Sequence, residues 1–114
     1  MAEVNNLPTI KGPIEILKDN EMWPLGLEFT KGKSVDDPIV ITGVRNYVHM
    51  EYRVLNHLFR WKKSELLIQG LCEKDDRKID CMLMKVSDHD GNNEHTEKVY
   101  FDITDGFNSL QINT

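Results

Sequence analysis

The chain has 114 residues, a hydrophobic fraction of 39% and a formal net charge of −5. This length suits a single domain over residues 1–114, with a core large enough to need no disulfide or metal. The acidic balance disfavours bulk electrostatic binding of nucleic acid or anionic membranes. No apolar run reaches membrane-spanning length and no secretory signal is visible, so we expect a cytoplasmic protein without membrane contact.

The first 42 residues predict short strands. We expect residues 1–12 to form an irregular lead-in. Three β-prone stretches follow at residues 14–17, 25–29 and 39–41, and polar turn-forming segments separate them.

Residues 43–61 allow two interpretations. Apolar side chains recur at helical spacing from Val44 to Phe59, with Glu51 as the one break. An all-β alternative remains, because residues 47–54 also alternate as a strand would. The helix is favoured, since the apolar spacing continues for longer than an ordinary strand.

The outer face of this helix would be basic. Its residues lie at successive four-residue steps or beside them: Arg45, His49, Arg53, His57 and Arg60. Such a stripe suits an acidic partner, a phosphate group or a nucleic-acid backbone. The alternative is a solvated face that only keeps the helix soluble.

Residues 64–104 predict a three-stranded antiparallel meander, with strands at 65–73, 78–86 and 98–104. A tight turn at Asp75-Asp76 sets the register of the first two strands. One face then pairs Cys72 with Ile79, Gly70 with Cys81 and Ile68 with Leu83. The other face pairs Glu73 with Lys78, Leu71 with Asp80, Gln69 with Met82 and Leu67 with Met84.

The register also divides the meander into a core face and an outer face. We expect the apolar set to be core: Ile68, Cys72, Ile79, Cys81 and Leu83. The opposite face would expose an adaptable interaction patch of Leu67, Leu71, Met82, Met84 and Tyr100. A homodimer or a partner protein could bury this patch, or the N-terminal strands could cover it. The two cysteines fall on diagonal positions roughly 7 Å apart, too far for an unstrained disulfide.

No sequence motif points to catalysis, a cofactor or a metal. The polar loop of residues 87–96 lacks calcium-loop spacing. The best acid–base set is His49, Glu51 and Asp80, with Asp102 nearby on the sheet. On a helix, residues two apart point away from each other, which separates His49 from Glu51. Enzyme function is therefore disfavoured.

The sequence thus predicts an α+β domain with one central helix packed on a mainly antiparallel sheet, in the order β-β-β-α-β-β-β. Residues 105–114 would form a C-terminal tail or a short helix. We expect a non-catalytic interaction or regulatory domain of the immunity type, which could self-associate through its exposed sheet face. The alternatives are a phosphate- or nucleic-acid-binding module and a small enzyme.

Overall fold

The computed structural model describes residues 9–10, 12–13, 27–44 and 46–107. Its elements follow the predicted order: β1 (Thr9–Ile10), β2 (Glu28–Phe29), β3 (Ile39–Val40), α1 (Tyr47–Leu58), β4 (Lys63–Lys74), β5 (Arg77–Ser87) and β6 (His95–Asp102). The expectation of an irregular lead-in over residues 1–12 is wrong at Thr9–Ile10, because these residues form β1 and pair with β2. The strand expected at residues 14–17 lies outside the described residues. Residues 104–107 form a single helical turn.

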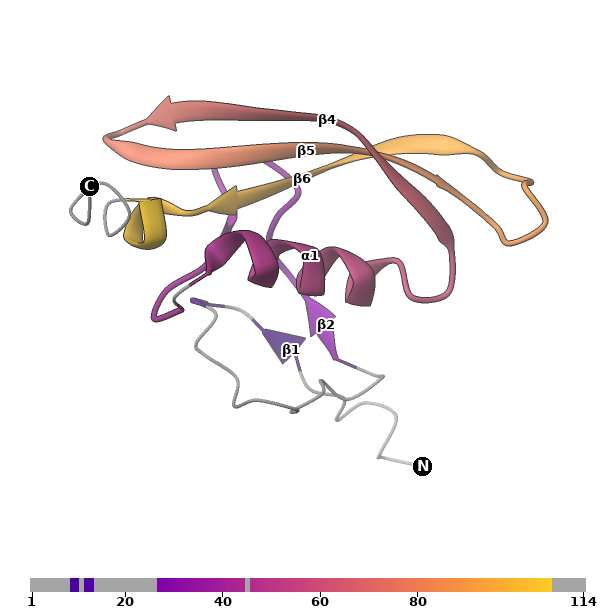
Figure 1. The fold of residues 1–114 in the computed structure, drawn as a ribbon, viewed down its shortest axis with the longest axis horizontal. Coiled ribbons are helices and arrows are strands. Elements are labelled where there is room, and N and C mark those ends of the chain that lie inside the picture. Colours follow the sequence, from indigo (N-terminus) through magenta and orange to yellow (C-terminus); the bar gives the residue numbers. More distant parts are fainter. Residues whose placement is uncertain (1–8, 11, 14–26, 45, 108–114) are drawn as a thin grey trace.

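The main sheet has four strands in the order β3-β6-β5-β4. Strands β4, β5 and β6 are antiparallel neighbours, and β3 pairs parallel with β6. Helix α1 packs on one face of this sheet, and the small parallel pair β1–β2 lies on the same side (Figure 1). The α+β prediction is confirmed.

Helix α1 begins after Asn46, which caps a free backbone N–H group of the first turn. The side-chain oxygen of Asn46 accepts a hydrogen bond from the backbone nitrogen of His49 at 3.0 Å. The helix then buries Met50, Val54 and Leu55 in the hydrophobic core. The all-β alternative for residues 44–55 is therefore wrong.

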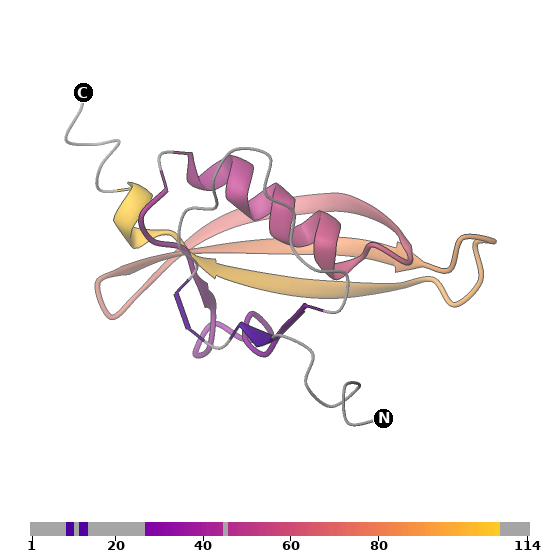
Figure 2. The ribbon, with the colours of Figure 1, turned by 90° about the horizontal axis from the view of Figure 1, so that it is seen from below.

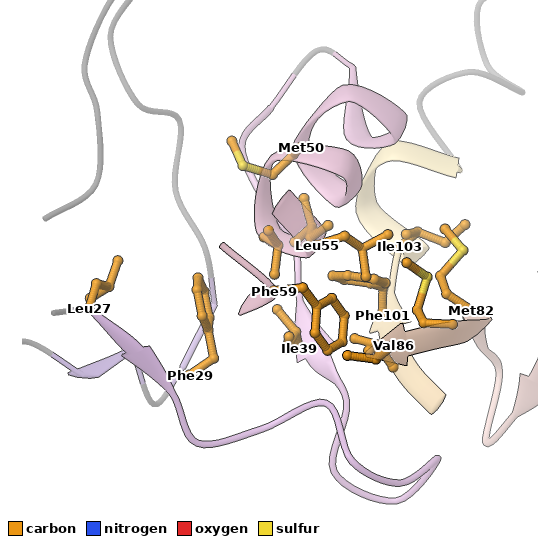
Figure 3. Close-up of a cluster of buried hydrophobic side chains, with 14 residues drawn as sticks. Leu27, Phe29, Ile39, Met50, Leu55, Phe59, Met82, Val86, Phe101 and Ile103 are labelled. Carbon is orange, nitrogen blue, oxygen red and sulfur yellow. The ribbon is translucent and has the colours of Figure 1, made fainter. Parts of the chain in front are cut away.

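The hydrophobic core lies between α1 and one face of the main sheet (Figure 3). Met82, Val86 and Phe101 supply the sheet side, and each is at most 1% exposed. Leu27 and Phe29 from the β2 region extend the same cluster.

The β4–β5 register is confirmed from Ile68 to Glu73 and from Leu83 to Lys78, around a two-residue turn. Asp75 and Asp76 both have positive φ, at 52° and 64°, as a tight hairpin turn of this twist requires. The predicted pairing of Leu67 with Met84 is wrong, because a β-bulge at Leu67 shifts the register and places Leu66 opposite Met84.

The assignment of the core face is also wrong, except at Ile79, which is buried as expected and only 2% exposed. Met82 and Met84 are 0% and 4% exposed, whereas Ile68 is 62% exposed and Cys72 is exposed as well. The reason lies in the neighbouring strand: β6 places Val99 opposite Met82, and both side chains face α1. The second face of the sheet, which we call the outer face, therefore carries Ile68, Cys72, Cys81, Leu83 and Tyr100.

The two edges of the main sheet differ in whether another described segment of the chain pairs with them. On the β6 side, β3 pairs with Phe101 and Asp102, and the backbone oxygen of Gly32 accepts a hydrogen bond from the Tyr100 nitrogen at 2.8 Å. Figure 2 shows β3 on this side and β4 at the opposite edge. In the described part of the chain, β4 pairs with β5 alone.

Candidate interaction surface

Among the elements β2 to β6 and α1, the open strand β4 is the most exposed. Eleven of its 12 residues are exposed, and the remaining one, Leu66, is half-buried. Its central segment, residues 66–72, carries no charge, and we call it the β4 edge. Three of its large apolar side chains are well exposed: Ile68 at 62%, Leu71 at 49% and Leu67 at 44%. One row of backbone donors and acceptors along it has no strand partner among the described residues.

The outer face continues inward from this edge. Cys81, Leu83 and Tyr100 lie there and are half-buried. Tyr100 is opposite Cys81 in the β5–β6 ladder. Burial raises the pKa of the Tyr100 hydroxyl, and the adjacent Cys81 raises it further. Together with Ile68, these side chains form an apolar surface that runs from β6 to the edge of the sheet.

The residues of the predicted interaction patch do not share one surface in the structure. Leu67 and Leu71 are exposed, as expected. Met82 and Met84 are buried beneath α1, and Tyr100 lies on the outer face instead of beside them. A partner could reach the two leucines and Tyr100, but not the methionines. The sequence does not reveal the exposure of Ile68, because its pairing with the apolar Leu83 is equally typical of a buried face.

The basic residues at the end of α1 contact the N-terminal segment. His57 Nε2 lies 2.8 Å from the carbonyl oxygen of Leu27, and its ring makes a T-shaped contact with Phe29, with the ring centroids 6.0 Å apart. Arg60 Nη1 donates to the His57 carbonyl oxygen at 2.6 Å, and its Nη2 lies 3.3 Å from Glu28 Oε1. These two side chains therefore hold β2 against the helix.

The other residues of the predicted basic face differ in exposure. His49 is exposed, Arg53 is half-buried and engaged in a contact, and Arg45 lies outside the described residues. The phosphate- or nucleic-acid-binding role remains a prediction.

The predicted acid–base set is brought together in part. Glu51 on α1 is 0% exposed and Asp80 on β5 is 5% exposed. Burial, and then the nearby Asp80 carboxyl group, raises the pKa of Glu51 to about 10. Asp80 accepts a hydrogen bond from Gln69 Nε2 at 3.2 Å. His49 is exposed and does not join this pair, as expected for a residue two positions away on a helix.

Asp102, the fourth member of the set, lies elsewhere. It stands opposite Ile79 on the other face of the sheet, where it accepts hydrogen bonds from Arg77 and Thr104. Among the described residues, no group of three or more His, Cys, Asp or Glu side chains could hold a metal ion.

A cavity of about 250 Å³ lies between the end of α1 and the loop after β2. Its apolar part includes Phe59 and Val99, and its cationic part includes Lys31, Lys33, Lys62 and Lys98. Ion pairs reduce this positive charge, since Lys31 contacts Asp37 at 3.3 Å and Lys62 contacts Asp88 at 2.6 Å. The cavity is thus a polar depression without a distinct ligand-binding arrangement.

Comparison with known protein families, curated proteins and solved structures found no match to this chain. Within the described residues, no helix is long and apolar enough to cross a bilayer.

Proposed function

We propose that the protein is a non-catalytic interaction domain that binds a partner strand along the β4 edge. The observation that carries this proposal is the exposure of a long, uncharged strand edge. An added strand can satisfy the free backbone groups of such an edge, and its side chains gain apolar contacts on the adjacent face.

Proteins usually protect an exposed edge strand with charge, proline, a bulge or a covering segment. β4 has one bulge, at Leu67, but residues 66–72 contain neither a charged residue nor a proline. An uncharged, β-prone segment of this length associates readily with other strands. A dedicated partner strand would occupy this edge specifically and so prevent non-specific association with other strands.

Site-specific photo-cross-linking tests the proposal. A benzophenone amino acid is placed at Ile68 on the edge and, as the matched control, at Asp90 in the exposed loop before β6. We expect a discrete adduct from position 68, and none from position 90, after irradiation in an extract of the producing cells. Equal labelling from both positions, or none from either, would refute the proposed function.

A further inference from the structure

We propose that the partner strand is β4 of a second copy, paired antiparallel about a two-fold axis through Gly70. This inference rests on the proposed function, because it names the partner of the same edge. The result would be a continuous eight-stranded sheet in the order β3-β6-β5-β4-β4-β5-β6-β3, in which both outer faces lie on the same side.

Gly70 is the first reason for this geometry. A glycine inside a strand weakens it, and often marks a place where another backbone approaches closely. A Cβ atom added at Gly70 would meet nothing within 4 Å, so the described part of the chain does not need a small residue there. With a second β4 strand paired at this point, Gly70 would lie opposite Gly70 of the other copy, so the two backbones could approach closely at the axis without any side chain between them.

Symmetry restricts the register that two β4 strands can adopt. Directly opposed side chains in an antiparallel pair share one face of the sheet. In a two-fold symmetric pair, two opposed residues must also point to the same face of their own strand, so their numbers differ by an even number. The axis therefore passes through a residue and not between two residues. With the axis at Gly70, Ile68 lies opposite Cys72 of the second copy on the outer face.

The bulge at Leu67 then determines which charges meet. The bulge shifts the β4 register by one residue against β5. It thereby reverses the sheet face to which the residues before Leu67 point, and this reversal applies equally to a strand paired at the free edge of β4. In the Gly70 register, Glu65 of each copy therefore lies opposite Lys74 of the other. The dimer would gain two opposite-charge pairs, one at each end of the uncharged segment.

Neighbouring registers lack this complementarity. Moving the axis one residue toward the N-terminus brings Lys63 opposite Lys74 of the second copy. Moving it one residue toward the C-terminus brings Glu65 opposite Asp76. Like charges directly opposed across strands are destabilising, so the charge pattern selects the register centred on Gly70.

Lys74 also makes an ion pair within its own copy, but this pair does not prevent Lys74 from pairing with Glu65 of the second copy. Lys74 contacts Asp36, but its side chain is 42% exposed and that of Asp36 is 70% exposed. Such solvent-exposed pairs contribute little to stability. Breaking the Lys74–Asp36 pair to form a pair with Glu65 of the second copy would therefore cost little.

Sedimentation equilibrium from micromolar to millimolar protein tests the dimer, and charge reversal tests its register. We expect Glu65→Lys or Lys74→Glu alone to weaken dimerisation about tenfold, because each turns two attractions into repulsions. The double variant should restore it. The matched control is Lys98→Glu, which makes the same charge change on the exposed part of β6 and should leave dimerisation unchanged.

A disulfide tests the same geometry directly. Ile68→Cys combined with Cys81→Ser places a thiol opposite Cys72 of the second copy, and mild oxidation should give a covalent dimer. Positions 68 and 72 of one strand are roughly 13 Å apart, too far to link within one copy. Adding Cys72→Ser should abolish the product.

The outcomes separate the two proposals. A chain that stays monomeric at every concentration overturns the dimer, yet the proposed function stands if position 68 still cross-links to another protein. A dimer that ignores the charge reversals and forms no disulfide overturns the Gly70 register. Monomeric protein without any specific cross-link at position 68 removes both proposals.

Discussion

Glu51 on α1 and Asp80 on β5 lie against each other inside the helix–sheet interface, and both are buried. Neither carboxylate oxygen of Glu51 has a hydrogen-bond partner of normal geometry. Two ionised carboxylates in this position would repel each other with little solvent screening. Glu51 is therefore held neutral at physiological pH, as its raised pKa of about 10 indicates.

The first prediction concerns stability at alkaline pH. The pKa of Glu51 rises from 4.5 to about 10 on folding, so the unfolded chain releases this proton first as pH increases. The Glu51 contribution to stability is thus fully present below about pH 4.5 and declines toward about pH 10. Glu51→Gln should abolish this decline and raise the free energy of unfolding at pH 8, measured by urea denaturation. Glu94→Gln, at an exposed loop residue, is the control. An unchanged pH slope in Glu51→Gln would mean that Glu51 is already ionised in the folded protein.

Local rules were sufficient to predict β2, β3, α1 and the β4–β5–β6 meander, but not β1, which lies where an irregular lead-in is expected. Apolar spacing identified α1, and the polar turn at Asp75-Asp76 set the β4–β5 register. The core face was not predictable in this way. Both faces of that hairpin carry apolar residues, and the choice depends on how β6 aligns with β5. That alignment follows from the loop of residues 88–94, which brings Val99 opposite Met82.

The candidate site illustrates the same limit. Seven uncharged residues in β4 are visible in the sequence, but their exposure depends on β4 being at the edge of the sheet. The position of β4 follows from where β3 pairs, far away in the chain, on the opposite side of β6. Likewise, the helical period of α1 could place Glu51 near the sheet, but not opposite Asp80.

The corrected core face predicts a contrast between two neighbouring positions. Met82→Ala should lower the free energy of unfolding by about 2–5 kcal/mol, because it leaves a cavity in a fully buried site. Ile68→Ala should lower it by less than about 1 kcal/mol, because Ile68 is 62% exposed. Denaturant unfolding of both variants at one protein concentration measures the difference. A larger loss in Ile68→Ala would contradict the assignment of the core to the α1 side.

Asp102 should be important for resistance to acid. Burial raises the pKa of its carboxyl group, but hydrogen bonds from Arg77 and Thr104 outweigh this and hold the pKa below its usual value of 3.8. Its contribution to stability is present above the unfolded value and is lost as pH falls through the lower folded value. Asp102→Asn should cost about 1.5–3 kcal/mol at pH 7, since it weakens hydrogen bonds to a charged group. It should also reduce the loss of stability on acidification. The exposed Asp90→Asn variant should show neither effect in acid titrations followed by circular dichroism.

Among the glycines in the described residues, Gly32 should be the least tolerant of substitution, because two constraints coincide there. Its φ is +101°, and an added Cβ would lie 2.7 Å from the Ile39 side chain. Gly91 shares the first constraint, with φ of +89°, but has open space around it. Gly91→Ala should therefore cost only the backbone term of about 1–2 kcal/mol, whereas Gly32→Ala adds an overpacking term of about 1–3 kcal/mol. Thermal unfolding should show a clearly lower midpoint for Gly32→Ala. Reducing the neighbouring side chain with Ile39→Val should recover part of the packing loss in Gly32→Ala and none of the loss in Gly91→Ala. If the two glycine variants unfold at the same temperature, Gly32 does not pack closely against β3.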